Sequence, residues 1–536
     1  MKLVFVAIAF VFFVGCMDYV NDPLLLQPPG LAPAIVEMID VPEGAPEVPR
    51  LTAGGTLRLA MRAPATLNPL LNEDVTVARV LQLMFEPLIS FDEDLRPVPN
   101  LAASLEFTFN GASVVVLIRD DALWSDGTAV TADDLIFSIE TLQNAPEAAI
   151  YRRNVENFAY FEALDERSVR IHFRTINGGS AYMFNFPIIP RHHFANDLNN
   201  MAPMGNGPFR FEAYTPMESL ELVRNMNTFR RLPNIVDVYV MLTPDAETDR
   251  HAFDRGLVDI YLAAVPEWAR HHSVKPVHHA EYYAMHYDFI GFNFARALPS
   301  LLEFRQAIAH SLDVEGLIAD VFLTHAMPAR SAVHPASWLH EPDVLLYGYN
   351  IEIAQALAAQ VQRDAQREGL WRVDEEGYEL PLRILVNREN IEGRRIAQIL
   401  SGQMRALGFE IELLELPVGD YTWNLLNGHF DLFVGGYNLS LQPDLRFAFH
   451  SESANNILSY KDFELDRLLE AAAVSGTDSQ FYRMLSDIQI HMAQQLPVIS
   501  LAFRHSALIA DRRVAGDLRP MPGNVFANVE EWFIVG

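Results

Sequence analysis

The chain has 536 residues, a mass of 60.4 kDa and a formal net charge of -29, and 50% of its residues are hydrophobic. Its length exceeds the roughly 250–300 residues that one hydrophobic core serves, so we expect two or three lobes. The hydrophobic content excludes a wholly disordered chain. The acidity argues against a nucleic-acid partner, because phosphate binding needs a basic surface. The single cysteine excludes an intramolecular disulfide.

The first 16 residues have the pattern of an export signal. Lys2 precedes an apolar run at residues 3–14, and Gly15 and Cys16 follow the run. The run has the length of a signal-peptide core and is too short for a spanning helix of about 20 residues. The segment that ends at Cys16 resembles a bacterial lipobox, in which the cysteine is lipidated and becomes the mature N-terminus. We therefore expect a lipoprotein signal peptide at 1–16; the alternative is an incidental cysteine behind an ordinary signal peptide.

Residues 17–53 are rich in proline, which cannot join helix interiors or central strands. The composition predicts a tether between a lipidated Cys16 and a folded body; an ordered N-terminal arm is the alternative. No apolar run of about 20 residues follows Cys16, so we expect no membrane span after it.

The folded body is expected to begin at residue 54. Residues 56–60 alternate in hydrophobicity and predict a strand, residues 75–83 have helical spacing, and residues 113–119 predict a valine-rich strand. Asp126 and Gly127 then form a turn dipeptide. Thr131 and Asp134 match the acidic variant of a capping box, which predicts a helix over 135–142.

The second half alternates strands and helices. The predicted helices span residues 304–312, 314–321, 351–366, 392–407, 463–473 and 478–494. The predicted strands span residues 382–386, 409–416, 430–434 and 498–503. The run from 382 to 416 reads as strand, helix, a glycine stop at Gly408 and strand, which indicates a βαβ unit and a parallel sheet.

Several segments resemble the bacterial extracellular solute-binding proteins of family 5. In chain order they are residues 55–60, 66–69, 85–89, 97–102, 117–127, 131–134, 205–211, 304–309 and 312–313. The densest similarity is residues 117–127, which read LIRDDALWSDG. The order and spacing of the segments span about residues 54–535, and the lipobox agrees with the many family members that are lipoproteins.

The resemblance implies an α/β fold of the periplasmic-binding-protein-like type II. Two hinged lobes would close on a ligand, and a small subdomain would be inserted in the first lobe. The first lobe would comprise 54–93, 202–290 and 503–536, the insertion 94–201, and the second lobe 291–502. The chain would cross between the lobes near residues 290–293 and 500–504.

The resemblance also implies a function. The protein would be the extracytoplasmic substrate-binding component of an ABC importer, would capture a peptide or peptide-like solute, and would deliver it to a permease and ATPase complex. It would be a monomer held at the cell membrane by its lipid, on the periplasmic face if the cell has two membranes. We expect no cofactor, no bound metal and no catalysis.

The expected ligand segment follows the predicted strand 430–434 and consists of Gly435, Gly436, Tyr437 and Asn438. Ligands bind α/β sheets beyond the C-terminal ends of strands, and glycine permits close approach of a ligand backbone. In peptide-binding relatives an aspartate near this point pairs with the ligand's ammonium, whereas here Gly436 occupies that place. A buried ammonium without a carboxylate is costly. Either Asp444 takes the role, or the ligand is not a free-amine peptide.

Other ligand contacts are implied by alignment with the family. Tyr421 lies where the family has an aromatic residue lining a side-chain pocket. The expected contacts from the other lobe and from a hinge strand are Thr66, Leu67, Asn68, Phe292 and Asn293. For each of these residues the alternative is plain core or turn structure.

Other motifs of the sequence have both a structural and a functional interpretation. We interpret Trp124 and the following turn as structural, and the acidic pairs at 120–121 and 133–134 as caps and turns, because they lack calcium-loop spacing. The histidine pairs at 192–193, 271–272 and 278–279 raise a metal hypothesis, since some relatives bind nickel complexes, but adjacent strand residues point to opposite faces. Residues 205–207 lack the third glycine of a dinucleotide fingerprint and favour a turn or hinge.

Two other classes of function remain open at this point. The first is a secreted hydrolase, although the sequence contains no GxSxG motif, P-loop or cysteine nucleophile after Cys16. The second is a surface adhesin or sensor that keeps the binding fold without a transporter.

Overall fold

The computed structural model describes residues 54–535 apart from 109–110 and 265–274, and these residues form one compact unit. The predicted signal peptide, Cys16 and the predicted tether lie outside the described residues. Within the described part of the chain, no helix combines the length and the apolar character that a bilayer crossing requires.

A four-stranded mixed sheet begins the fold. Its strands lie in the order β1 (Thr56–Met61), β10 (Asp237–Leu242), β9 (Ser219–Arg224) and β8 (Phe209–Thr215), with β1 parallel to β10 and the other pairs antiparallel. Helices α2 (Val75–Leu81) and α5 (Ala246–Asp254) belong to this part of the chain. The predicted strand at 56–60 is confirmed, and the predicted helix at 75–83 ends two residues earlier.

An antiparallel sheet is inserted between β1 and β8 in sequence. Its order is β4 (Ala102–Phe107), β5 (Ser113–Ile118), β7 (Ser168–Phe173) and β6 (Phe158–Ala163). Helix α3 (Ala132–Gln143) packs on it, and its predicted capping box is present between Thr131 and Asp134. Smaller elements here are β2 (Ile89–Phe91), β3 (Pro97–Pro99), η1 (Arg152–Val155), η2 (Ser180–Phe184) and α4 (Arg191–Phe194).

The structural role predicted for Trp124 is confirmed. Its side chain is fully buried, and the indole Nε1 donates to Asp134 Oδ2 at 3.2 Å. The chain reversal at residues 205–207 packs directly against backbone, since a Cβ on Gly205 would lie 2.0 Å from the carbonyl oxygen of Met84. This reversal therefore requires glycine for close packing.

A seven-stranded mixed sheet follows. Its path is β11 (Ile260–Ala264), β17 (Val498–Asp511), β12 (Val277–Phe292), β16 (Leu432–Asn438), β14 (Leu382–Asn387) and β15 (Ile411–Leu416), with β13 (Ala326–Pro328) beside β17. Strands β14 and β15 are parallel and joined by α10 (Ile391–Ala406), so the predicted βαβ unit is confirmed. The predicted strand at 498–503 is longer than expected because its C-terminal half pairs with β11.

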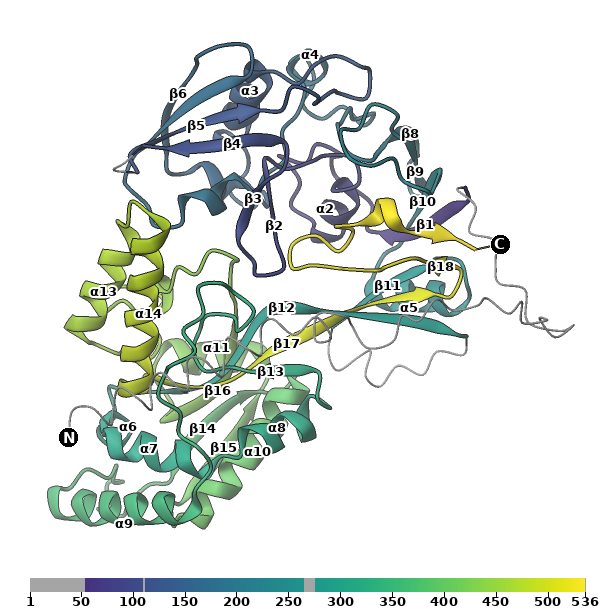
Figure 1. Cartoon of the computed structure of the whole chain (residues 1–536). Helices are drawn as coiled ribbons and strands as arrows, with labels where there is room; N and C mark the ends of the chain where they lie inside the picture. The colour runs from purple at the N-terminus through teal and green to yellow at the C-terminus, as the bar shows by residue number, and fades with distance from the viewer. Residues whose placement is uncertain (1–53, 109–110, 265–274, 536) are drawn as a thin grey trace, which may run out of the picture. The chain divides into compact units, whose positions relative to one another are not determined.

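The predicted helices at 304–312, 314–321, 351–366, 463–473 and 478–494 are confirmed to within two residues, whereas the helices at 297–300, 418–426 and 446–449 were not predicted. The helices are α6 (Ala297–Ser300), α7 (Leu302–Ser311), α8 (Val314–Val321), α9 (Ile351–Glu368), α11 (Val418–Leu426), α12 (Arg446–Phe449), α13 (Phe463–Ala473) and α14 (Asp478–Gln495). The chain ends in β18 (Val514–Ala515), η3 (Val529–Glu531) and β19 (Phe533–Ile534). Helices α13 and α14 pack side by side (Figure 1).

The long strands β12 and β17 run side by side through several hydrophobic cores (Figure 1). From β17, Leu508 joins the core around Leu57 and Trp532, Leu501 joins a second core under α7 and α9, and Phe503 joins a third. The pair of strands therefore connects cores that are built from distant parts of the sequence.

A buried ion pair joins the same two strands. Arg504 of β17 donates from Nη2 and Nε to the two carboxylate oxygens of Asp288 of β12, at 2.6 and 2.7 Å. The Arg504 Nη1 also lies 3.5 Å from Glu392 Oε2 on α10. Burial raises the pKa of Asp288, but the bonds from Arg504 outweigh this effect, so the pKa lies below its usual value. Asp288 is therefore ionised where the strands meet α10.

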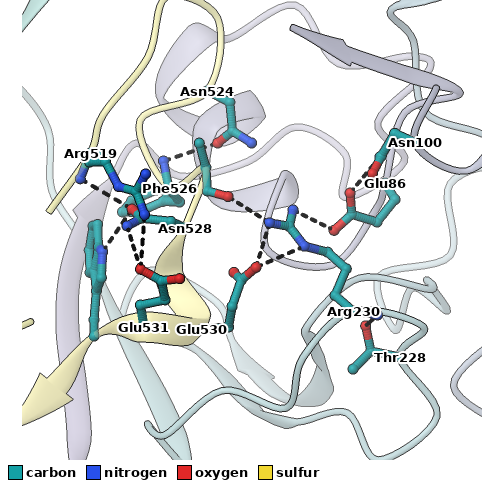
Figure 2. A network of polar contacts seen from close by, with 12 residues as sticks. Glu86, Asn100, Thr228, Arg230, Arg519, Asn524, Phe526, Asn528, Glu530 and Glu531 are labelled. Atoms are coloured by element: carbon teal, nitrogen blue, oxygen red, sulfur yellow. Dashed lines mark hydrogen bonds and ion pairs between the residues drawn. The ribbon is translucent and has the colours of Figure 1, made fainter. Parts of the chain in front are cut away.

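A second polar network holds the C-terminal segment to the first sheet (Figure 2). Arg230, in the loop between β9 and β10, donates from Nη2 to Glu530 Oε1 and to the carbonyl of Ala527, both at 2.6 Å. Its Nη1 lies 3.3 Å from Glu86 Oε1, and Glu86 Oε2 accepts from Asn100. The guanidinium thus neutralises two carboxylates in the interior.

Candidate functional site

The predicted ligand segment lies inside a strand rather than after one. Gly435, Gly436, Tyr437 and Asn438 are the last residues of β16, which corrects the predicted strand end at residue 434. The parallel partner β14 pairs with β16 only as far as Val434, whereas the antiparallel partner β12 continues beside it to the end. The sequence pattern missed this extension because glycine is unfavourable in isolated strands. Beyond Val434, the β14-facing edge of β16 has no strand partner in the described chain.

The two glycines are required by neighbouring side chains. A Cβ on Gly436 would lie 2.8 Å from both His286 Nε2 and the carbonyl oxygen of Tyr287. A Cβ on Gly435 would lie 2.8 Å from the Phe433 ring and 3.1 Å from the hydroxyl of Tyr421. Packing within the protein is thus a sufficient reason for glycine at both positions.

The two tyrosines of the predicted site support this strand. Tyr421 on α11 donates its hydroxyl to the carbonyl of Val434 at 3.2 Å, at the point where β14 stops pairing. The Tyr437 ring lies between Phe289 and Phe447, with ring centroids 5.0 and 5.1 Å away. Burial raises the pKa of Tyr437 to about 12, so it is a neutral hydroxyl at pH 7.

A cavity of about 280 Å³ adjoins the end of β16, and we call it the β16 cavity. It contains two of the predicted residues, Asn438 and Asp444. Much of its remaining lining is apolar, including Leu95, Met285, Val333, Leu439, Leu445 and Phe447. A lining of apolar groups with few polar ones is typical of a small-molecule site.

Asp444 is engaged by its own neighbour. Arg446 donates from Nη2 and Nε to the two carboxylate oxygens at 2.6 and 2.9 Å, and its backbone N–H donates to the same carboxylate at 3.0 Å. Partial burial raises the pKa of Asp444, but the contacts with Arg446 more than reverse this, so the pKa lies below its usual value. The carboxylate is ionised and already neutralised.

His334 lines the β16 cavity and was not predicted from the sequence. It is 1% exposed, and its Nδ1 accepts a hydrogen bond from the backbone N–H of Ala336 at 3.1 Å. Its ring packs against Tyr283 and Phe503, with centroids 4.9 and 4.6 Å away. Burial lowers its pKa to about 4, so the imidazole is neutral at pH 7.

The other predicted contacts lie in the interior. Thr66 is 7% exposed, while Leu67 and Asn68 are fully buried; the Asn68 amide donates to the carbonyl of Leu198 and its Oδ1 accepts from the N–H of Leu70. This is the turn structure that the sequence left open as the alternative. Their role as ligand contacts stays a prediction.

Phe292 and Asn293, at the end of β12, are also interior. Phe292 is fully buried, and Asn293 is 2% exposed. The Asn293 amide donates to the carbonyls of Gly428 and Phe430 at 3.1 and 2.9 Å. These bonds fix the chain where β12 leaves the sheet, and a ligand role for both residues likewise stays a prediction.

Two other cavities of the described chain are of similar or larger volume. One, of about 270 Å³, lies beside α2 and contains Arg230 and Glu86, whose charges are paired with each other. The other, of about 410 Å³, lies beside α8 and contains Tyr347 and Leu345. Although this α8 cavity is larger, we take the β16 cavity as the candidate site because two of the predicted residues, Asn438 and Asp444, line it.

The histidine pairs are dispersed. His192 Nε2 lies 3.0 Å from Asp126 Oδ2, and His193 Nε2 lies 2.9 Å from the carbonyl of Ala202. The pair at 278–279 is on β12, and the pair at 271–272 lies outside the described residues. Over residues 54–535, less the two gaps, no group of three or more His, Cys, Asp or Glu side chains is arranged to hold a metal ion.

Comparison with known proteins gives consistent results. A sequence model of the bacterial extracellular solute-binding proteins, family 5, matches residues 96–457. The oligopeptide-binding protein AppA of Bacillus subtilis is 22% identical over 494 residues, which cover 88% of this chain and 90% of AppA.

Solved structures show the same fold. The ABC transporter substrate-binding protein CtaP of Listeria monocytogenes matches with a TM-score of 0.77 and 22% identity, over 90% of this chain and 100% of that one. NikZ of Campylobacter jejuni, in complex with Ni(L-His), matches with a TM-score of 0.66 and 21% identity, over 90% and 99%. The predicted fold class, a mixed α/β fold of the two-lobed periplasmic-binding type II, is confirmed by these likenesses.

Proposed function

The chain belongs to the bacterial extracellular solute-binding proteins of family 5, and from that premise we propose that it captures peptides or peptide-like solutes for an ABC importer. The family is one of solute-binding receptors that act outside the cytoplasm. AppA and the dipeptide-binding protein of Escherichia coli, both similar over most of this chain, are named for peptides.

The observation that supports this function is a cavity at the end of β16, a strand with one unpaired edge in the described chain. Residues 435–438 have β12 on one side and no strand on the other in the described chain. An extended peptide can bind such an edge through hydrogen bonds from the main chain of the peptide, and these bonds do not depend on the sequence of the peptide. The β16 cavity beside the edge then accepts one end or one side chain, and water fills unused space.

The same cavity gives a reason for closure on the ligand. Leu95 and Arg153 come from the proposed insertion at 94–201, whereas His334 and residues 438–447 come from the proposed second lobe at 291–502. A ligand that touches both parts favours the closed arrangement, and only that differential contact can drive closure.

The remaining partners follow from the proposed role. Lipidation at Cys16 anchors the protein to the membrane through residues 17–53, and the loaded monomer delivers its ligand to a permease and ATPase complex. The ligand is released chemically unchanged. Replacement of Cys16 by serine moves the protein from the membrane fraction to the supernatant, and retention in the membrane would overturn the anchor.

The test is thermal unfolding and calorimetry of the full chain with a pool of tri- to nonapeptides. At a ligand concentration 100 times Kd, binding to the native state stabilises it by about 2.7 kcal/mol, a readily measured rise in Tm. Asn438→Trp, which fills the cavity from an exposed position on β16, should abolish the rise. The matched control Asn455→Trp, at an exposed position away from the cavity, should retain it. No rise with any peptide would refute peptide capture.

The same assay distinguishes the alternatives. Mass spectrometry after long incubation should recover intact peptide, whereas cleaved peptide would indicate the secreted hydrolase. The fold likeness to NikZ motivates a second arm with Ni(L-His). A Tm rise with that complex and not with peptides would assign the protein to nickel-complex transport.

A further inference from the structure

The β16 cavity has one unbalanced charge, and that charge is positive. We propose that the cavity holds the carboxylate end of the ligand, flanked by an apolar side chain, and does not hold an ammonium group. The inference rests on the proposed function, because it names the chemical class that the same site recognises.

The only carboxylate in the cavity lining is unavailable to an ammonium. Of the lining residues, Arg153 and Asp444 are the two with a full charge at pH 7. Three hydrogen bonds from Arg446 already occupy Asp444, through both of its oxygens. An ammonium bound there would compete with a bidentate guanidinium, which is the stronger geometric partner of a carboxylate.

Arg153 is the group without a counter-charge. It lies on η1, its side chain is exposed, and it has no ion-pair partner among residues 54–535 as far as they are described. Arg153, Arg446 and Asp444 together give a net charge of +1, with two cations and one anion. An entering carboxylate would neutralise this charge, whereas an ammonium would double it.

Two neutral polar groups of the cavity lining, Asn438 and His334, offer donors. Asn438 Oδ1 is occupied by His286 Nδ1 at 2.7 Å, which leaves the Asn438 amide N–H groups to donate. The Ser440 hydroxyl already donates its hydrogen to the carbonyl of Gln442, so it offers no donor to a ligand. The neutral imidazole of His334 accepts from the N–H of Ala336 at Nδ1, so its hydrogen is on Nε2, which is buried and has no hydrogen-bond partner among the described residues. Donors beside an unpaired guanidinium suit a group that has only acceptors.

The apolar part of the lining defines the rest of the ligand. Met285, Leu439 and Phe447 lie in the same cavity as Arg153. A volume of about 280 Å³ accommodates a carboxylate and one aliphatic side chain. The favoured ligand is therefore a peptide bound by its C-terminal residue, or an N-acylated apolar amino acid, and a free amine is not required.

The experiment compares four forms of one tri- to pentapeptide pool of apolar composition: unmodified, N-acetylated, C-amidated and modified at both ends. Calorimetry with the full chain should show that amidation weakens binding by about 10- to 100-fold, the range of one charge-assisted pair. Acetylation should change Kd by less than about threefold, because no group in the cavity contacts the amine.

Variants of Arg153 and Asp444, with a control variant of Arg152, test which residues cause the difference in affinity between the acid and amide forms. Arg153→Gln should remove most of the difference between acid and amide, whereas the neighbouring Arg152→Gln, which lies outside the cavity lining, should keep it. Asp444→Asn should leave the acid form bound at least as tightly as in the wild type.

The outcomes are distinguishable. If N-acetylation of the peptide abolished binding, or if the Asp444→Asn variant no longer bound the unmodified peptide, the cavity would be an ammonium site. Either result would overturn the inference and leave the proposed function intact. Equal binding of acid and amide would also overturn it. Failure of all four forms to bind would refute peptide capture itself.

Discussion

The buried pair between Asp288 and Arg504 makes a quantitative prediction for stability. Their side chains are 2% and 14% exposed, and each guanidinium–carboxylate bond is 2.6–2.7 Å long. Asp288→Asn keeps the shape but leaves Arg504 with only Glu392, 3.5 Å away, as a counter-charge. Loss of one partner of a buried pair costs about 3–5 kcal/mol, and because Glu392 remains we expect about 3 kcal/mol at pH 7.

The pH dependence of this loss has a defined sign. The pKa of Asp288 is lowered in the folded state, so its stabilisation is present above the unfolded value of about 3.9 and disappears as pH falls through the folded pKa. The difference in free energy of unfolding between wild type and Asp288→Asn should therefore be constant from pH 5 to 7 and shrink below about pH 4.

Urea unfolding followed by tryptophan fluorescence measures both effects. The matched control is Glu412→Gln, which breaks the exposed cross-strand pair between Arg383 and Glu412, whose side chains are 38% and 42% exposed. An exposed pair contributes about 0–1 kcal/mol. If Asp288→Asn cost no more than this control, the reasoning from burial would be refuted.

Three further predictions concern other buried groups. Gly205→Ala should cost about 3 kcal/mol, since its Cβ would meet a backbone carbonyl at 2.0 Å, whereas Gly348→Ala, with nothing within 4 Å, should be nearly neutral in the same urea assay. Trp124→Phe should lower Tm through loss of an indole hydrogen bond of about 1–2 kcal/mol; an unchanged Tm would contradict that role. Because burial lowers the pKa of His334 to about 4, wild-type stability should fall as pH drops from about 6.5 to 4, and His334→Gln should flatten that fall.

The secondary structure was largely readable from the sequence because local signals agreed with it. Thr131 and Asp134 form the predicted capping box of α3, and Gly408, with a φ of 89°, follows the end of α10 as predicted. The βαβ unit at 382–416 needed only hydrophobic periodicity and that glycine. Such signals act within a few residues of each other.

The candidate site was less predictable because it depends on contacts between distant segments. The sequence pattern placed Gly435 and Gly436 beyond the end of a strand at residue 434, yet β12, about 150 residues earlier in the sequence, holds them in the strand. His334 joins the cavity from a loop and Arg153 from the short helix η1, and neither segment has a local motif. The ion pair between Asp444 and Arg446 could have been predicted from the sequence, since only one residue separates them.

The first hydrophobic core has a consequence for how the protein is made. It combines Leu57, near the start of the body, with Leu508 and Trp532, near the end. A ribosome would have released nearly the whole polypeptide before that core could assemble, and such long-range closure is slow. Completion of this core is therefore a late step of folding, because it waits for the last residues of the chain.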